Sequence, residues 1–513
     1  MNYKKLKKIR VYISLLFFIA TCLIFVDIYR LFPVEIYSVV LHLQFIPSLV
    51  EFVSSPAFAL AGFIIVLILT LLIGRVYCSS ICPLGTLMDI ITRIRFKFFK
   101  RQKYIYKKPQ NFLRYSLLSI TILAWFFGFF SFVILLDPYS IFGRILNTMF
   151  LPVIIFLNNS ITALLELFDI FTLININYFT IPWFVLAISV IYLFTILVFS
   201  FFYGRQYCNL ICPVGTFLGF FSKFSLFKIS FDKDKCNQCG SCEIVCKAYC
   251  IDAGIMKLDF DRCVSCYNCM KVCPESGFRY EYSFAKPKQD YDSKRREVII
   301  KSSAMVLTLS CFTSCSEHQT KDEVKKLNVS QFPVIPPGAI SLRHFNDTCT
   351  ACYICVSACP TDVIQPTFLD FGLSGILHPK MDYWKSFCNY DCTKCTEVCP
   401  TGALLPLSME QKHLTQIGKV KFVKKDCVVE TEKKDCGACA EHCPTKAVQM
   451  VPYGKLTIPE VTEDICIGCG ACEFACPTKP KKAIYVESNP VHRKAKKPKP
   501  EKKKKIETEE FPF

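Results

Sequence analysis

Residues 236–246 read CNQCGSCEIVC, and residues 263–274 read CVSCYNCMKVCP. Each stretch holds three cysteines separated by two residues and a fourth cysteine after three more, and the second stretch ends in Cys-Pro. This spacing is typical of bacterial ferredoxins that hold two [4Fe–4S] clusters, in which each fourth cysteine ligates the other cluster. A tight loop then presents three thiolates to one face of a cluster. The pattern predicts a two-cluster ferredoxin domain over residues 229–285.

The predicted ligands form two crossed sets. The first set is Cys236, Cys239, Cys242 and Cys273, and the second set is Cys263, Cys266, Cys269 and Cys246. A zinc site would need only two Cys-x2-Cys pairs, without the third cysteine and the trailing Cys-Pro. Lys247 stands where a proline usually follows the fourth cysteine, and the nearby Cys250 is interpreted as a non-ligand.

Four more cysteine quartets follow within residues 336–490, and each ends in Cys-Pro. They are Cys349, Cys352, Cys355 and Cys359; Cys388, Cys392, Cys395 and Cys399; Cys427, Cys436, Cys439 and Cys443; and Cys466, Cys469, Cys472 and Cys476. The first and last have regular spacing, whereas the middle two open with longer gaps. This nesting predicts that the outer quartets interleave as one ferredoxin pair and the inner quartets as another. Of the 32 cysteines, the 24 in these six quartets are therefore interpreted as ligands for six [4Fe–4S] clusters and not as part of a disulfide scaffold.

The first 228 residues are dominated by Leu, Ile, Phe and Val. A spanning helix needs about 20 mostly apolar residues, and four segments qualify, at about 11–32, 57–75, 112–136 and 181–203. A fifth apolar stretch, 146–172, carries Asn158, Asn159, Glu166 and Asp169, which favours an interfacial or re-entrant segment. The expected fold class is multi-domain, with an α-helical transmembrane bundle over residues 1–228 and α+β ferredoxin-like [4Fe–4S] domains after it.

Basic residues set the expected orientation in the membrane. The N-terminus and the loop 76–110 are rich in Lys and Arg, whereas the loop 33–56 has neither and 137–180 is net acidic. Because cytoplasmic loops carry an excess of Lys and Arg, the basic side is predicted to be cytoplasmic. The formal charge of +19 lies largely in these loops and in the tail 494–505, so nucleic acid is not the expected partner. The N-terminal apolar run has no small-residue cleavage site and is interpreted as a retained anchor.

One thirteen-residue motif occurs twice in the helical half. Residues 74–86 read GRVYCSSICPLGT, and residues 204–216 read GRQYCNLICPVGT. Each copy follows a predicted span at its cytoplasmic end. We expect the four motif cysteines to converge at a pseudo-twofold interface, where they would hold a metal or a further cluster, or act as redox thiols: Cys78, Cys82, Cys208 and Cys212. The alternative is a helix-ending turn with incidental cysteines.

The segment 286–335 joins the two cysteine-rich regions. Residues 293–315 read SKRREVIIKSSAMVLTLSCFTSC, and paired arginines before a short apolar run are typical of a twin-arginine export signal. Export would place the domain 336–490 in the periplasm. The alternative is a surface amphipathic linker, which would leave all clusters in the cytoplasm. Thr313-Ser314-Cys315 also has the form of a lipoprotein site, and the basic segment 491–513 is expected to be a disordered tail.

These motifs resemble a known group of proteins. Residues 1–285 are similar to the NapH-type membrane ferredoxins of nitrate reductase systems, and the related NosR and CcoG polyferredoxins share the Cys-x3-Cys-Pro repeat. Residues 293–490 are similar to the NapG-type periplasmic ferredoxins, most specifically at 388–402, CNYDCTKCTEVCPTG. The chain thus resembles a fusion of the two, although the signal arginines are internal and no counterpart of the NosR flavin domain is present.

The resemblance implies oxidation of menaquinol or ubiquinol at a bacterial inner membrane and delivery of electrons to a periplasmic reductase or cytochrome. Arg75, Arg205 and Asp137 are candidate quinol-side groups, each with an equally good structural role as a headgroup anchor or a helix cap. One alternative is a CcoG-like assembly factor that reduces a metal or thiol during oxidase maturation. Another is a passive electron-carrying subunit without a quinol site. No Ser/His/Asp set, phosphate loop or haem motif supports a hydrolase or transferase.

Overall fold

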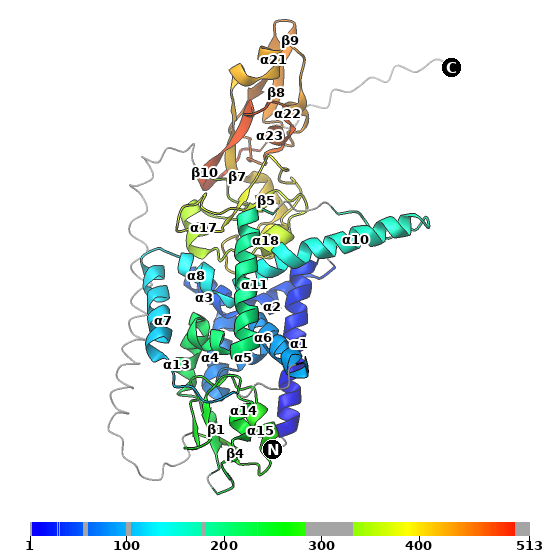
Figure 1. The fold of residues 1–513 in the computed structure, drawn as a ribbon. Coiled ribbons are helices and arrows are strands. Elements are labelled where there is room, and N and C mark those ends of the chain that lie inside the picture. The colour runs from blue at the N-terminus through cyan, green and yellow to red at the C-terminus, as the bar shows by residue number, and fades with distance from the viewer. Residues whose placement is uncertain are drawn as a thin grey trace.

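The computed structural model describes residues 3–27, 29, 31–54, 60–98, 104–176, 181–232, 234–283 and 332–497. The twin-arginine-like segment 293–315, including Cys315, and the tail beyond residue 497 lie outside these residues. A helical layer occupies the middle of the molecule (Figure 1). A first cysteine-rich unit lies at the end of this layer near the N-terminus, and a second, longer cysteine-rich unit extends from the opposite end.

The helical layer is built from the apolar first half of the chain. Its helices are α1 (Tyr3–Val26), α2 (Val34–His42), α3 (Phe45–Ser54), α4 (Leu60–Ile73), α5 (Val76–Ser80), α6 (Pro83–Phe98), α7 (Asn111–Phe126), α8 (Ser131–Leu136), α9 (Pro138–Ile145), the π-helical turn η1 (Leu146–Phe150), α10 (Leu151–Glu166), α11 (Trp183–Tyr203), α12 (Gln206–Leu210) and α13 (Pro213–Ser222). Figure 1 shows α1, α7 and α11 running along the long axis of the molecule.

The expected spans and the observed helices differ in length. In the described part of the chain three helical segments are long and apolar enough to cross a membrane, namely 5–26, 138–166 and 183–203, or four if the bent pair α2–α3 counts as one. Helix α7 ends at Phe126, because Gly128 takes a positive φ of 79° and a new helix begins at Ser131. The predicted span 112–136 is therefore two helices, and the described helix within the predicted span 57–75 has only 14 residues.

The segment 138–166 qualifies as a span by length and composition alone. It is interrupted by the π-helical turn η1, which precedes Pro152 near the start of α10. In Figure 1, α10 runs across the direction of α1 and α11 and projects sideways from the layer. Asn158 and Asn159 of α10 donate to the carbonyls of Ile174 and Ile176, at 3.0 and 2.8 Å. The side-chain amides of both residues therefore have hydrogen-bond partners in the segment that follows α10.

The first cysteine-rich unit has the short elements of a small ferredoxin. They are β1 (Phe227–Phe231), α14 (Ser241–Ile244), β2 (Ile251–Asp252), β3 (Lys257–Leu258), α15 (Asn268–Val272) and β4 (Phe278–Tyr282). Strand β1 pairs antiparallel with β4, and β2 pairs antiparallel with β3. The cysteines lie in one small core with Ile229, Phe260 and Phe278. Leu6 of α1 packs against this core, so α1 reaches from the helical layer onto the unit.

The second unit contains the last four quartets. Its helices are α17 (Leu342–Thr348), α18 (Ile354–Ser357), α19 (Lys394–Glu397), α20 (Met409–Leu414), the 3-10 turn η4 (Lys424–Asp426), α21 (Val428–Thr431), α22 (Ala438–Glu441) and α23 (Ala471–Ala475). Its strands are β5 (Ile364–Pro366), β6 (Pro379–Met381), β7 (Thr415–Phe422), β8 (Val448–Tyr453), β9 (Leu456–Val461) and β10 (Ile484–Lys494). They form three antiparallel pairs, β5–β6, β7–β10 and β8–β9.

Strand β10 corrects the predicted boundary at residue 490. The sequence predicted a disordered tail from residue 491, because the composition there becomes basic. The strand instead continues through Lys494, since Arg493 and Lys494 pair with Gln416 and Thr415 of β7. The backbone of residues 493 and 494 can pair with β7 whatever their side chains are, so the basic composition did not predict that the strand continues.

Candidate functional site

The first unit brings seven of its eight predicted ligands together in the two crossed sets. Cys242 interacts electrostatically with Cys236 and with Cys273 from the second stretch. Cys269 interacts with Cys266, Cys263 and with Cys246 from the first stretch. Cys239 lies on the same loop as Cys236 and Cys242 and is exposed. Each fourth cysteine therefore lies with the three cysteines of the other stretch, as a two-cluster ferredoxin requires.

The second unit also forms crossed sets, but not between the quartets that the sequence predicted. Cys355 interacts with Cys349, Cys352 and Cys399, whereas Cys388 and Cys395 interact with Cys359 and Cys392. In the last two quartets, too, each fourth cysteine lies with the first three cysteines of the other quartet. One cavity is lined by Cys427, Cys436, Cys439 and Cys476, and another by Cys443, Cys466, Cys469 and Cys472. The outer–inner pairing was wrong. Consecutive quartets pair, because each ferredoxin unit folds from one continuous stretch of chain.

Backbone N–H groups point at several of these sulfur atoms. Gly277 N donates to Cys273 Sγ at 3.1 Å, and Gly468 N donates to Cys466 Sγ at 3.3 Å. Ala351 N and Leu404 N lie 3.5 and 3.4 Å from the sulfurs of Cys349 and Cys399. Hydrogen bonds to cysteine sulfur stabilise the thiolate and tune the reduction potential of a cluster. The donors fit the ligand role predicted for these cysteines.

Cys250 lies closer to the ligands than the sequence indicated. Its Sγ is 3.5 Å from Cys246 Sγ, and it is buried. It also interacts with Cys263, the first cysteine of the same set. Cys250 is thus a neighbouring thiol between two predicted ligands of one cluster.

The repeated motifs converge inside the helical layer. Cys78, Cys82, Cys208 and Cys212 are buried and line one small cavity of about 10 Å3, which we call the thiol chamber. Pro138, Tyr77 and Tyr207 complete its walls. The cavity lined by Cys443, Cys466, Cys469 and Cys472 has the same volume, about 10 Å3. The convergence predicted from the repeat is therefore present, and the space matches that of a ferredoxin cysteine set.

The two arginines of the motifs cross over between the copies. Arg75 of the first copy donates to the Gly215 carbonyl of the second at 2.5 Å, and Arg205 of the second donates to the Cys78 carbonyl of the first at 2.9 Å. A Cβ atom at Gly85 or Gly215 would lie 2.3 or 2.1 Å from the carbonyl oxygen of Cys78 or Cys208. Only glycine fits at these two positions, which explains the Pro-x-Gly that ends each motif.

The chamber sulfurs also receive hydrogen-bond donors. Gly215 N lies 3.4 Å from Cys212 Sγ, and Arg205 Nη1 lies 3.8 Å from Cys208 Sγ. Hydrogen-bond donors at cysteine sulfur tune the reduction potential of a bound cluster. This donor set fits an iron–sulfur group bound by the four cysteines. Among the described residues, no group of three or more His, Cys, Asp or Glu side chains is arranged to hold a single metal ion.

Asp89 of α6, which the sequence did not single out, connects elements at the end of the helical layer next to the first unit. Its carboxylate lies 2.7 Å from Arg205 Nε, 2.5 Å from Lys247 Nζ and 3.2 Å from Arg10 Nη1. Burial alone would raise the pKa of Asp89, but the Arg205 guanidinium and the Lys247 ammonium hold it well below its ordinary value. Asp89 therefore joins α1, the second motif and the first ferredoxin unit. The sequence feature that could have identified Asp89 is its position as a single acidic residue shortly before a run of basic residues.

Asp89→Asn is expected to lower the free energy of unfolding by about 3–5 kcal/mol, because it leaves buried Arg205 and Lys247 without a counter-charge. Denaturant titration of the detergent-solubilised chain, followed by helix content, measures this loss. The matched control is Asp464→Asn, whose exposed pair with Lys496 is expected to contribute less than about 1 kcal/mol. Equal effects of the two substitutions would contradict the role assigned to Asp89.

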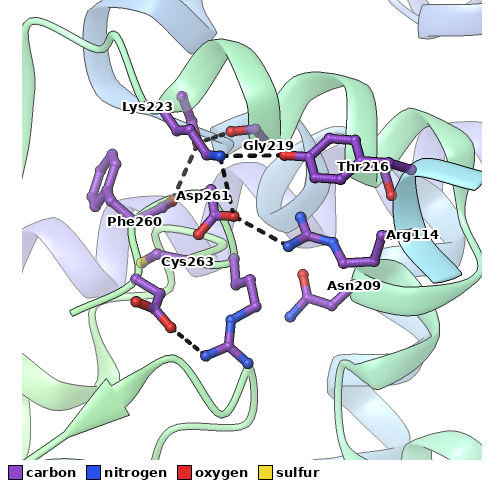
Figure 2. A network of polar contacts seen from close by, with 12 residues as sticks. Arg114, Asn209, Thr216, Gly219, Lys223, Phe260, Asp261 and Cys263 are labelled. Carbon is purple, nitrogen blue, oxygen red and sulfur yellow. Dashed lines mark hydrogen bonds and ion pairs between the residues drawn. The ribbon is translucent and has the colours of Figure 1, made fainter. Parts of the chain in front are cut away.

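A second polar network fixes the loop before Cys263 (Figure 2). Arg114 of α7 donates to Asp261 at 3.1 Å, and Lys223, which follows α13, lies 3.9 Å from the same carboxylate. Arg75 also reaches this loop, donating to the carbonyls of Arg262 and Cys263 at 2.6 and 3.4 Å. The loop before Cys263, the first cysteine of a predicted ligand set, therefore contacts three parts of the helical layer. They are α7, the residue after α13 and the first repeated motif.

At the opposite end, α9 docks onto the loop that carries Cys349 and Cys352. Arg144 donates to the Ala351 carbonyl at 3.4 Å, and Asn147 donates to the Tyr353 carbonyl at 3.4 Å. A Cβ atom at Gly143 would lie 2.6 Å from the Cys352 carbonyl oxygen, so glycine permits this approach. Pro138, five residues earlier in α9, lines the thiol chamber. At 1.5 Å per residue these points of α9 are only about 8 Å apart along its axis.

The three candidate quinol-side groups have structural roles here. Arg75 and Arg205 are fully buried in the crossed contacts between the motifs. Asp137 caps α9, accepting from Tyr139 N and Ser140 N at 3.3 and 2.9 Å and from Ser140 Oγ at 2.6 Å. The helix-cap role stated for Asp137 is therefore confirmed, whereas the headgroup-anchor role stated for the two arginines was wrong, because their side chains are fully buried.

Family models match the same regions. A 4Fe-4S binding domain model matches residues 55–102 and 184–232, each of which contains one repeated motif. A second 4Fe-4S binding domain model matches 256–276 and 343–365, and a 4Fe-4S dicluster domain model matches 434–480. No solved structure matches the chain.

Three curated relatives carry descriptive names. The chain is 28% identical to the ferredoxin-type protein NapH of Haemophilus influenzae, over 43% of this chain and 67% of that protein. It is 29% identical to the methylamine utilization ferredoxin-type protein MauM of Methylorubrum extorquens, over 36% of this chain and 83% of that protein. It is 25% identical to the putative electron transport protein YccM of Escherichia coli, over 43% of this chain and 54% of that protein.

These models and relatives define the chain as an iron–sulfur electron-transfer protein of the ferredoxin type. It is a polyferredoxin of the NapH type, as its motifs indicated.

Proposed function

We propose that the chain takes electrons from membrane quinol and passes them through the helical layer to an acceptor beyond its second unit, a reductase or cytochrome on the periplasmic side. The observation that carries this proposal is the order of the cysteine sets. Arg75 of the first motif contacts the Cys263 loop of the first unit, and α9, whose Pro138 lines the thiol chamber, contacts the second unit through Arg144. Iron–sulfur clusters, when bound, accept and release single electrons.

The protein supplies a continuous packed connection between these sets. The chamber cysteines share one hydrophobic core with Val264, which lies between Cys263 and Cys266, and with Cys352 of the second unit. Arg75 fixes the first unit to the chamber, and α9 fixes the chamber to the second unit. Buried apolar side chains around the chamber exclude water from the connection. We assign each crossed cysteine set to one [4Fe–4S] cluster, which makes six, and the chamber to a seventh.

The direction of the chain in the membrane follows from its charges. The first unit lies at the end of the layer that carries the basic start of α1 and the basic last turn of α6, so we place residues 229–285 in the cytoplasm. The second unit lies at the other end, and we place it in the periplasm of an inner-membrane protein. The segment between the units would then cross the membrane, as the twin-arginine-like sequence implies.

Addition of a menaquinol analogue to the purified, cluster-loaded chain tests the proposal. We expect the visible absorbance of the oxidised clusters to bleach under anaerobic conditions. A chain that dithionite bleaches but menaquinol does not would exclude quinol oxidation and leave a passive carrier. A chain that instead reduces a copper ion or a thiol, without responding to quinol, would favour an assembly factor.

A further inference from the structure

We propose that the head group of the quinol binds in a pocket between α1 and α6, beside the first ferredoxin unit; naming quinol as the ligand rests on the proposed function. The pocket has a volume of about 270 Å3 and is open on one side, which is near the lower end of the roughly 300–1,000 Å3 of small-molecule sites. Its walls come from α1, α6 and two segments of the first unit, the loop that follows α14 and carries Cys246 and the start of α15, which carries Cys269.

The pocket has an apolar, partly exposed edge. Leu15 of α1 and Phe96 of α6 line it, and their side chains are 37% and 38% exposed. Apolar side chains on the outside of a membrane-embedded helix contact acyl chains. A ligand with an isoprenoid tail can therefore keep its tail in the bilayer while its polar ring enters between the two helices.

The interior of the pocket is polar and partly unsatisfied. Ser14 Oγ and Thr86 Oγ1 lie 2.8 Å apart, and hydroxyl groups can both donate to and accept from a quinol hydroxyl or a quinone carbonyl. Arg10 is only 8% exposed, and its Nε atom is buried without a hydrogen-bond partner among the described residues. A buried unpartnered donor is costly, so a ligand oxygen that accepts from it would gain affinity.

The position of the pocket favours a redox ligand. Lys247 follows Cys246 directly and Asn268 precedes Cys269 directly, and both line the pocket. Cys246 and Cys269 belong to the same crossed set. The head group would thus lie against the two backbone segments that hold one cluster. The lining has four cationic side chains and one carboxylate: Lys7, Arg10, Arg93 and Lys247, and Asp89. This net positive charge favours binding of the electron-rich quinol ring and of the deprotonated quinol.

Titration with a fluorescent hydroxyquinoline N-oxide, a quinol analogue whose emission is quenched on binding, tests the site in the full chain in nanodiscs. We expect saturable binding at one site per chain. Ser14→Leu fills the polar interior and should weaken binding at least tenfold, whereas Thr86→Val removes only the hydroxyl and should weaken it less. Ser160→Leu, the same change at an exposed position of α10, should bind as the wild type does.

Iron content and bleaching by dithionite report whether each variant is folded and loaded. If menaquinol bleaches the wild type and both pocket variants equally, the pocket is not the quinol site, although the proposed function stands. If the analogue does not bind and menaquinol bleaches no form of the chain, the proposed function fails as well. Displacement of the analogue by anionic phospholipid, but not by menaquinone, would assign the pocket to a lipid head group and overturn the proposal.

Discussion

Cys82→Ser is expected to remove about four iron atoms per chain, one cluster, and to abolish electron transfer between the two cysteine-rich units. The reason is geometric: Cys82 is one of four buried thiols that line a single chamber, and this chamber lies between the loop of Cys263 and the helix that contacts Cys352. Its counterpart in the second motif, Cys212, should give the same result.

Cys22→Ser serves as the control, because Cys22 is a partly buried cysteine of α1 that lies outside every cysteine set described above. Iron and sulfide analysis, with electron paramagnetic resonance of the reduced chain, measures the loss. An unchanged iron content in both Cys82→Ser and Cys212→Ser would contradict the assignment of a cluster to the chamber.

Removal of iron by a chelator under reducing conditions is expected to unfold the second unit and to leave the helical layer folded. Six cysteines belong to the core around β8 and β9, where they replace much of the apolar packing: Cys427, Cys439, Cys443, Cys466, Cys472 and Cys476. Metal binding to such a site contributes folding free energy directly. The helical layer is packed mainly through Phe, Tyr, Leu and Ile side chains, which need no metal.

Hydrogen exchange followed by mass spectrometry separates the two regions. Amides of the β8–β9 pair should lose protection after chelation, whereas amides of α1 and α11 should keep it. Retained protection in β8–β9 would show that the polypeptide alone stabilises the second unit.

The sequence predicted the local parts of the site well, because ligand spacing is a local property of a loop. The two crossed sets of the first unit and the convergence of the repeated motifs both follow from such spacing. Pairing among the last four quartets is not local. The gaps before Cys392 and Cys436 suggested a nested arrangement, whereas the structure pairs consecutive quartets.

Contacts that depend on tertiary structure were beyond the sequence. Gly143 approaches the Cys352 carbonyl across more than two hundred residues of chain, and no local pattern marks that approach. Asp89 acquires its role only when Arg10, Arg205 and Lys247 come together around it. The length of the helices was also overestimated, since hydropathy does not register the break at Gly128.

Electron transfer across a sealed membrane tests the central claim most directly. The full chain is reconstituted into liposomes that contain ferricyanide, with valinomycin and potassium present to dissipate the potential, and membrane-impermeant dithionite is added outside. We predict that the enclosed ferricyanide is reduced in liposomes with the wild-type chain and with Cys22→Ser, but not in empty liposomes or with Cys82→Ser. Reduction at the same rate with Cys82→Ser, or no reduction with the fully loaded wild type, would contradict a path through the thiol chamber.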